Sequence, residues 1–113
     1  MKQNQTRIED TVSQITLADS EIHNNQDNGV HLLDSSIHAF SNDQIYQNSD
    51  NGLLAENVDD ITIENCAINN NNDNGISLTN SQNHIISNTQ VYQNQYHGIN
   101  AETVSHTTIT SSG

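Results

Sequence analysis

A repeat with a period of 23 residues is the feature that most constrains the fold of this chain. Four of its five glycines are 23 positions apart each time, and the first three of them follow Asp-Asn. These glycines are Gly29, Gly52, Gly75 and Gly98. The apolar columns with the same step are Ile22, Ile45, Ile68 and Val91; Val30, Leu53, Ile76 and Ile99; Leu32, Ala55, Leu78 and Ala101; and Leu17, Phe40, Ile63, Ile86 and Ile109. So many columns in one register indicate stacked structural repeats.

The sequence within each repeat predicts strands and turns. Apolar and polar residues alternate, as in Gly-Ile-Ser-Leu-Thr-Asn at 75–80, which is the period of a strand. The apolar stretches are short and are bounded by Asn, Asp, Gly and Ser, which favour turns. One 23-residue unit cannot bury its own apolar face, so the units must stack. We therefore predict an all-β fold, a right-handed parallel β-helix of nearly five coils with three short strands per coil.

We expect a single domain over residues 1–113. Residues 22–113 form four regular coils, and residues 1–21 form an N-terminal cap with a partial first coil. Ile15 and Leu17 open the last strand of that partial coil, but the register fails further back, where Arg7 falls under Val30. The last coil has no C-terminal cap in the sequence, which favours either a fragment of a larger protein or end-to-end pairing of two copies through open strand edges.

Equivalent residues of a β-helix stack about 4.8 Å apart, so each column acquires a physical meaning. We expect the unbroken asparagine column to form a ladder of amide hydrogen bonds inside the solenoid. We expect each repeated glycine to adopt a positive φ in the turn before the next strand. The asparagine column comprises Asn25, Asn48, Asn71 and Asn94.

The charge balance excludes several classes of partner. Fourteen acidic residues face only two basic ones, which gives a net charge of −12 and argues against nucleic acid and membrane as partners. A single cysteine, Cys66, excludes an internal disulfide framework and a zinc finger, and we expect it to be a half-buried small residue. The acidic composition, poor in lysine and cysteine, favours a secreted, extracellular protein.

Two columns suggest ligand binding. One column consists of three stacked carboxylates, Asp27, Asp50 and Asp73. Their like charges repel, and a bound calcium ion would relieve this repulsion. The alternative is that they are ordinary solvated turn residues. An outward column contains His23, Tyr46, Asn69 and Tyr92. Its two tyrosines lie two coils apart, about 9.6 Å, which is the reach of a disaccharide. Exposed aromatic rings bind sugars, but aromatic residues are also common in strands.

Two further pairs of ionisable residues keep the period. Glu56 and Glu102 lie two coils apart in one column, a spacing compatible with the two carboxylates of an inverting glycosidase, with ordinary surface charge as the alternative. His38 and His84 share a column with Ile61 between them, so we expect hydrogen-bonded histidines at a strand end and no metal site.

The segment Tyr-Gln-Asn-Gln-Tyr-His-Gly-Ile-Asn-Ala-Glu-Thr-Val-Ser-His at 92–106 resembles the catalytic region of the mannuronan C5-epimerases, which are β-helix enzymes that modify alginate. The family run is similar to Y-x-N-x-R-H-G-F-N-V-x-T-S-T-H. The resemblance implies that His97 corresponds to the family's active-site histidine, while Tyr96 stands where the family has arginine. Thr79 stands at a family aspartate, and of the family's D-P-H-E motif only Glu56 is kept.

The resemblance implies a polysaccharide-acting protein but leaves enzymatic activity open. His97 and Glu56 are the candidate catalytic residues, and the candidate glycan-binding residues are Tyr46, Tyr92, Tyr96 and His23. We expect a secreted, non-catalytic or fragmentary module that binds a uronate-type glycan, with calcium as a candidate cofactor. The alternatives are a structural spacer or adhesin stalk without a ligand, and part of an active epimerase or lyase whose other catalytic residues lie elsewhere.

Overall fold

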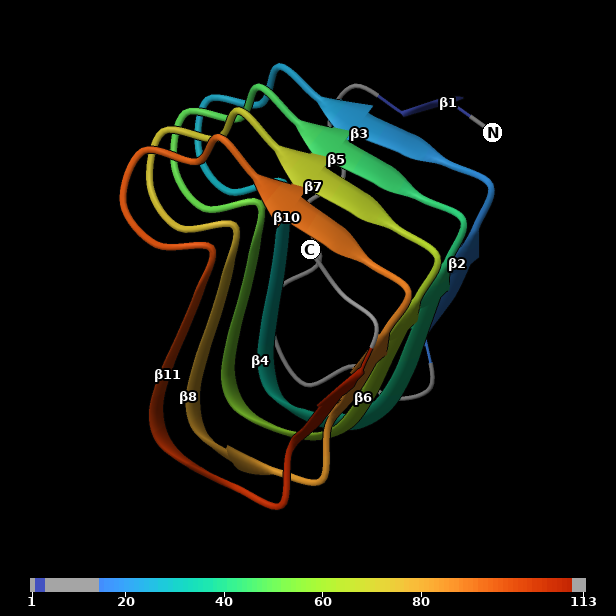
Figure 1. The fold of residues 1–113 in the computed structure, drawn as a ribbon, viewed down its shortest axis with the longest axis vertical. Coiled ribbons are helices and arrows are strands. Elements are labelled where there is room, and N and C mark those ends of the chain that lie inside the picture. The colour runs from blue at the N-terminus through green and yellow to red at the C-terminus, as the bar shows by residue number, and fades with distance from the viewer. Residues whose placement is uncertain (1, 4–14, 111–113) are drawn as a thin grey trace.

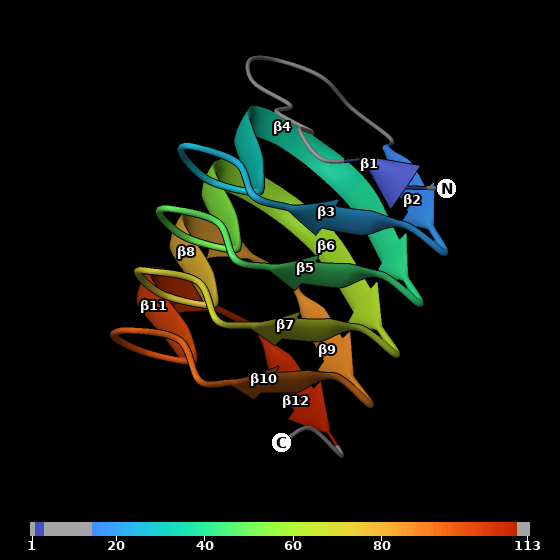
Figure 2. The same ribbon diagram turned by 90° about the horizontal axis from the view of Figure 1, so that it is seen from above.

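The computed structural model describes residues 2–3 and 15–110, which form a parallel β-solenoid of about four coils (Figures 1 and 2). All regular elements in these residues are strands. They are β1 (Lys2–Gln3), β2 (Thr16–Ala18), β3 (Glu21–His23), β4 (Val30–Ser41), β5 (Gln44–Tyr46), β6 (Leu53–Glu64), β7 (Ala67–Asn69), β8 (Ile76–Gln82), β9 (Ile85–Ser87), β10 (Gln90–Tyr92), β11 (Ile99–Ser105) and β12 (Thr108–Thr110).

The strands stack in parallel with the predicted register of 23. One sheet has the order β1-β3-β5-β7-β10, and the other has the order β11-β8-β6-β4-β2, with β9 joining β6 to β12. Ile45 pairs with Ile22 on one side and with Ile68 on the other. The expectation of three short strands per coil holds only for the later coils, because β4 and β6 each continue over 12 residues around a corner.

The N-terminal part departs from the period, as expected. β2 pairs with the end of β4 in the 23-residue register, so Leu17 lies beside Phe40 and opens a partial coil. β1 instead pairs Lys2 with Glu21, an offset of 19 residues, and adds an edge strand beside β3. The rest of the predicted cap, residues 1 and 4–14, lies outside the described residues.

Left-handed backbone at the corners explains why the chain is so rich in asparagine and aspartate. Among the described residues, sixteen non-glycine residues have a positive φ, and all fall into four columns with the 23-residue step. Eleven of them are Asn or Asp, the side chains that best tolerate this conformation. The columns are Asp19, Asn42, Asn65 and Asn88; Asn24, Gln47, Asn70 and Gln93; Asp34, Asn57, Asn80 and Thr103; and Ile37, Asp60, Asn83 and His106.

The repeated glycines serve a different purpose from the one predicted. None of the four has a positive φ, so that expectation was wrong. The backbone of Gly29, Gly52 and Gly75 instead passes too close to the next coil for a side chain. A Cβ on Gly52 would lie 2.7 Å from the carbonyl oxygen of Gly75 and 2.8 Å from Nδ2 of Asn71. Asp-Asn-Gly therefore recurs because of close packing between coils.

Buried asparagines form two hydrogen-bonded ladders through the solenoid. In the predicted ladder, Asn25 Nδ2 donates to Asn48 Oδ1 at 2.8 Å, and Asn48 and Asn71 each donate to the next coil at 2.9 Å. A second ladder, which the sequence analysis missed, runs in the opposite direction: Asn51 Nδ2 donates back to Asn28 Oδ1 at 3.0 Å. These ladders flank an apolar core whose central members, such as Ile68, are fully buried.

The two column histidines belong to this interior. Nδ1 of His84 accepts a hydrogen bond from the Ile61 backbone N–H, and Nε2 lies 2.8 Å from Ser81 Oγ. His38, two coils earlier, makes the equivalent contacts with the Ile15 backbone N–H and with Ser35 Oγ. Burial lowers the pKa of both rings, which favours their neutral forms. The prediction of hydrogen-bonded histidines is confirmed, and both side chains are almost fully buried.

Candidate functional site

The outer surface of β3, β5, β7 and β10 presents aromatic and amide side chains in two columns. We call this surface the tyrosine face. The strand register places His23, Tyr46, Asn69 and Tyr92 side by side on successive coils, as predicted. The second column comprises Glu21, Gln44, Ala67 and Gln90. Figure 2 shows the four strands one above another on one side of the solenoid.

Two rings at the N-terminal end of the tyrosine face are stacked. The His23 and Tyr46 rings have centroids 4.8 Å apart and planes inclined by only 4°. Tyr46 donates its hydroxyl hydrogen to Glu21 Oε1 at 3.1 Å, and burial together with this bond raises the pKa of Tyr46. Tyr92, two coils further on, is 44% exposed. The face thus combines fixed rings at one end with an accessible ring at the other.

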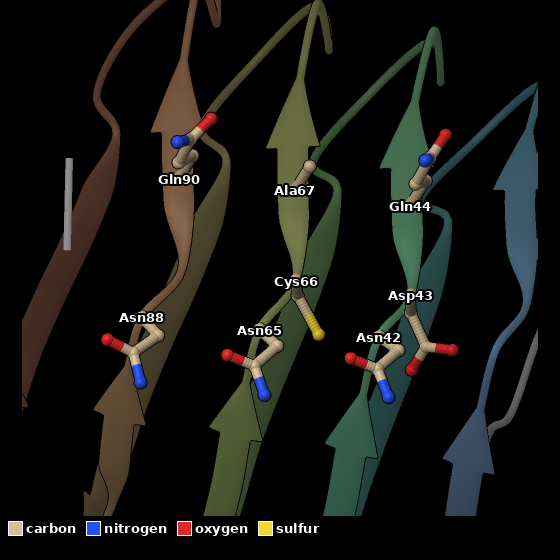
Figure 3. A pocket seen from close by; sticks show the side chains of 8 residues that line it. All are labelled: Asn42, Asp43, Gln44, Asn65, Cys66, Ala67, Asn88 and Gln90. Atoms are coloured by element: carbon tan, nitrogen blue, oxygen red, sulfur yellow. The ribbon is translucent and has the colours of Figure 1, made fainter. Parts of the chain in front are cut away.

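A shallow polar groove of about 370 Å³ borders the tyrosine face. Figure 3 shows Gln44, Ala67 and Gln90 in a row along one side of it, with a row of three asparagines opposite. The small Ala67 side chain leaves a gap between the two glutamines. The opposing asparagines are Asn42, Asn65 and Asn88. Amides both donate and accept hydrogen bonds, which suits them to ligands rich in hydroxyl groups.

A buried carboxyl group lies at the same corner and was not recognised from the sequence. Asp43 is 1% exposed; its Oδ1 accepts the Ser20 backbone N–H at 2.9 Å, while its Oδ2 has no hydrogen-bond partner among the described residues. Desolvation raises the pKa of Asp43 to about 6. The signal was available, because Asp43 is the one acidic residue in an otherwise neutral column of small residues. That column comprises Ser20, Asp43, Cys66 and Thr89.

The neighbours of Asp43 show what this position requires. Each donates to the carbonyl oxygen two residues before it: Ser20 to Ala18 at 3.0 Å and Thr89 to Ser87 at 2.9 Å. Cys66 makes the same contact through Sγ at 3.3 Å, is 4% exposed, and has a pKa raised to about 11 by burial. An ionised Asp43 cannot donate such a bond. The column is therefore structural, and Cys66 is more buried than predicted.

One candidate catalytic residue and one candidate glycan-binding residue lie outside the strands of the tyrosine face. His97 and Tyr96 belong to the turn between β10 and β11, which projects outward in Figure 1, and Tyr96 is 73% exposed. The His97 backbone N–H donates to Asn74 Oδ1 at 3.1 Å, so His97 continues the second asparagine ladder. Their predicted roles in catalysis and glycan binding stay predictions.

Glu56 has a partner that the sequence analysis did not anticipate. Its Oε1 lies 2.9 Å from His31 Nε2, and the two side chains are 44% and 17% exposed. Through Thr79 the strand register places Glu56 in one column with Glu102, as predicted. A histidine in hydrogen-bond contact with a carboxylate is a common acid–base arrangement, so this pair is a candidate on the β4–β6–β8–β11 surface.

The aspartate turns stack as predicted. The Asp50 backbone N–H donates to Asp27 O, and Asp73 donates to Asp50 O, both at 3.2 Å. Desolvation, followed by the neighbouring Asp73 and Asp27, raises the pKa of Asp50. Within residues 2–3 and 15–110, no group of three or more His, Cys, Asp or Glu side chains is placed to hold a metal ion. The calcium site therefore remains a prediction that needs further oxygen ligands, from turn carbonyls or from a glycan.

The coils, the ladders and the register define the class of protein. The chain belongs to the family that contains a right-handed β-helix region, whose model matches residues 8–112, and the predicted handedness is thereby confirmed. No curated protein sequence matches the chain significantly. Among the described residues there is no helix long and apolar enough to cross a membrane.

Solved structures with a similar fold include three alginate-related enzymes. The Azotobacter vinelandii mannuronan C-5 epimerase AlgE6 A-module has a TM-score of 0.74 at 15% identity and matches 96% of this chain but 34% of its own. The periplasmic alginate epimerase AlgG, as a T265N mutant, has a TM-score of 0.70 at 14% identity, and the match covers 91% of this chain and 35% of AlgG. The A. vinelandii mannuronan C-5 epimerase AlgE4 A-module has a TM-score of 0.64 at 15% identity, and the match covers 87% of this chain and 33% of the A-module. The chain thus spans about a third of these structures, and at this identity the likeness shows the fold.

Proposed function

We propose that this chain is a polysaccharide-binding β-helix module of a secreted or periplasmic protein, and that it binds a uronate-type glycan on the tyrosine face. The observation that carries the proposal is the combination of stacked and accessible rings with an amide groove on one surface. Tyr46 and Tyr92 are two strand spacings apart, about 9.6 Å, so they suit successive sugar units. The fold shared with proteins named as alginate epimerases supports this substrate class.

The distribution of charge is compatible with an acidic glycan on this face despite the net charge of −12. The only carboxylate in its two columns is Glu21, which already accepts the Tyr46 hydroxyl hydrogen. The other members from Gln44 onward are neutral amides, tyrosines and an alanine. An anion bound between Gln44 and Gln90 therefore avoids direct repulsion, and calcium is expected to strengthen binding by screening the remaining acidic surface.

The test is titration of the chain with mannuronate and guluronate oligomers, with and without calcium, followed by calorimetry or NMR. Tyr92→Ala is expected to weaken binding several-fold, because it removes the accessible ring of the tyrosine face. Tyr96→Ala is the matched variant, since Tyr96 is also an exposed tyrosine but lies in the outer turn. Loss of binding in Tyr96→Ala alone would move the site to the turn that contains His97. Absence of binding in all conditions would contradict the proposal and favour a structural spacer.

Catalysis is tested separately in the same samples. Proton NMR of polymannuronate incubated with the chain would reveal guluronate or unsaturated products. We expect neither, because Tyr96 and Thr79 replace the arginine and aspartate that the epimerase resemblance requires. Formation of either product would instead assign activity to this chain, and Glu56→Gln would then show whether the contact between Glu56 and His31 takes part.

A further inference from the structure

The turns that lead into β4, β6 and β8 each contain an Asn-Gly pair (Figures 1 and 2). Asparagine before glycine loses its side-chain amide more readily than before other residues, because glycine has no side chain to hinder attack by its own backbone nitrogen. The pairs lie at 28–29, 51–52 and 74–75, whereas the fourth coil has His97 before Gly98. Three chemically labile pairs are thus stacked one coil apart.

The packing of the coils requires both members of each pair. Glycine is needed because a Cβ on Gly29 or Gly52 would lie 2.7 Å from the carbonyl oxygen of the glycine in the next coil. Asparagine is needed for the second ladder, in which Asn28 Oδ1 accepts from the backbone N–H and from Nδ2 of Asn51, at 3.1 and 3.0 Å. Asn51 Oδ1 in turn accepts the Asn74 backbone N–H at 3.1 Å. Replacing either member would therefore remove a contact between coils or create a clash.

In the folded chain the neighbouring coil holds the glycine nitrogen that would attack. The Gly29 N–H donates to Asn51 O at 3.0 Å. The Gly52 N–H donates to Asn74 O at the same distance, and the third glycine is held in the same way by the fourth coil. For the reaction this N–H must lose its proton, and the nitrogen must reach Cγ of the preceding asparagine. Breaking the hydrogen bond between coils is therefore the first requirement, and it costs free energy.

Burial keeps water away from the same pairs. Asn28, Asn51 and Asn74 are 5%, 6% and 8% exposed, respectively. The base that removes the glycine proton and the water that completes the reaction therefore have little access to them. When a buried group reacts only after the structure around it opens, its rate follows the population of the open form. Folding should thus slow the reaction at all three asparagines.

We infer that Asn28, Asn51 and Asn74 are sites of spontaneous deamidation, which folding suppresses and unfolding activates. The glycine nitrogen attacks Cγ of the asparagine and forms a C–N bond, and the side-chain nitrogen leaves as ammonia, which yields a five-membered succinimide. Water then opens this ring at either carbonyl carbon and leaves aspartate or isoaspartate. Water is the only other reactant, and neither step is an oxidation or a reduction.

Either product opposes restacking of the coils. Conversion of Asn51 to aspartate removes the Nδ2 donor that binds Asn28 Oδ1, and it places a negative charge at a buried position. Isoaspartate also adds a methylene group to the backbone, which disrupts the 23-residue register. Each event adds a further negative charge to a chain whose net charge is already −12. Unfolding of this protein therefore becomes irreversible with time.

The test is to incubate the chain at pH 8.5 with and without 8 M urea and to follow deamidation of each asparagine by peptide mass spectrometry. Asn28, Asn51 and Asn74 should react at least about tenfold faster in urea than in the folded chain. The control is the chain in urea at pH 5, where the glycine nitrogen keeps its proton. After dilution of the urea, the recovered circular dichroism should fall with incubation time at pH 8.5 and stay constant at pH 5.

Asn51→Asp supplies one product directly and should lower the free energy of unfolding, measured by urea denaturation. Asn72→Asp is the matched control, because it adds the same charge at an exposed position, and it should change stability little. Equal rates of deamidation in the folded and unfolded chain would overturn the inference, as would equal losses of recovery at the two pH values. Unchanged stability of Asn51→Asp would also overturn it. Failure of Asn51→Asp to fold is the extreme of the expected result, and the rates in the unmodified chain then decide.

Discussion

Asn48 donates its side-chain amide to Asn71 Oδ1 at 2.9 Å and accepts the Asn25 amide at 2.8 Å, so one residue bonds two neighbouring coils at once. Its backbone N–H also donates to Asn71 Oδ1. At 1% exposure none of these groups can turn to water instead. The coils are therefore joined by polar interactions as well as by the apolar columns.

Replacing Asn48 with alanine should destabilise the fold more than its size suggests. The change leaves the Asn25 donors and the Asn71 acceptor buried with fewer partners, and we expect a loss of roughly 3 kcal/mol in the free energy of unfolding. Urea denaturation followed by circular dichroism measures it. Asn72→Ala, at an exposed position in the next coil, serves as the control and should change stability little. Equal effects of the two substitutions would show that the asparagine ladder does not contribute to the free energy of unfolding.

Replacing a repeated glycine with alanine should cost more stability in an inner coil than in the last coil. Gly52→Ala forces a Cβ to within 2.8 Å of atoms of Ile68 and Asn71, so we expect a loss of several kcal/mol or failure to fold. Gly98→Ala meets its nearest atom at 3.5 Å and should be tolerated. Thermal denaturation of both variants tests this difference. Similar melting temperatures would contradict the close-approach explanation.

One corner residue is poorly suited to its backbone. Ile37 is β-branched, 53% exposed and has a φ of 64°, whereas its column equivalents include Asp60 and Asn83. Ile37→Asn should therefore raise the free energy of unfolding by about 1 kcal/mol, since asparagine tolerates the left-handed region. Ile85→Asn is the matched control, because Ile85 is 49% exposed but lies in strand β9. It should have no stabilising effect.

Asp43 predicts a specific dependence of stability on pH. Its pKa is raised from 3.8 to about 6 by burial, so the folded state favours the protonated carboxyl. The associated stability is complete below pH 3.8 and is lost as pH rises through about 6. Asp43→Thr restores a neutral hydroxyl like that of Thr89 and should gain roughly 2 to 3 kcal/mol at pH 7, with little gain near pH 4.

Urea denaturation at each pH measures the free energy of unfolding of the unmodified chain and of Asp43→Thr, and the difference between the two values is the readout. His38 and His84 have lowered pKa values and weaken the fold as pH falls below 6.5, which is the opposite direction. Their contribution is common to both proteins and cancels in the difference. A gain in Asp43→Thr that is constant from pH 4 to pH 7 would exclude ionisation of Asp43 as its cause.

The repeat alone determined the architecture. A 23-residue step in the apolar, asparagine and glycine columns permits only one alignment of the coils, because a shift by one residue would turn the apolar side chains outward. The first asparagine ladder, the placement of Tyr46 and Tyr92 on one column, and the shared column of the hydrogen-bonded His38 and His84 all followed from that alignment. The family match confirmed the handedness.

Only the tertiary structure showed which contacts the residues of each column make with neighbouring coils. The glycines avoid a clash with the following coil rather than adopt a positive φ, because the separation between two backbones is not encoded in the order of residues. The contact between Glu56 and His31 and the buried oxygen of Asp43 depend in the same way on side chains from different coils. Periodicity determines which residues stack, whereas distances and desolvation between coils determine their chemistry.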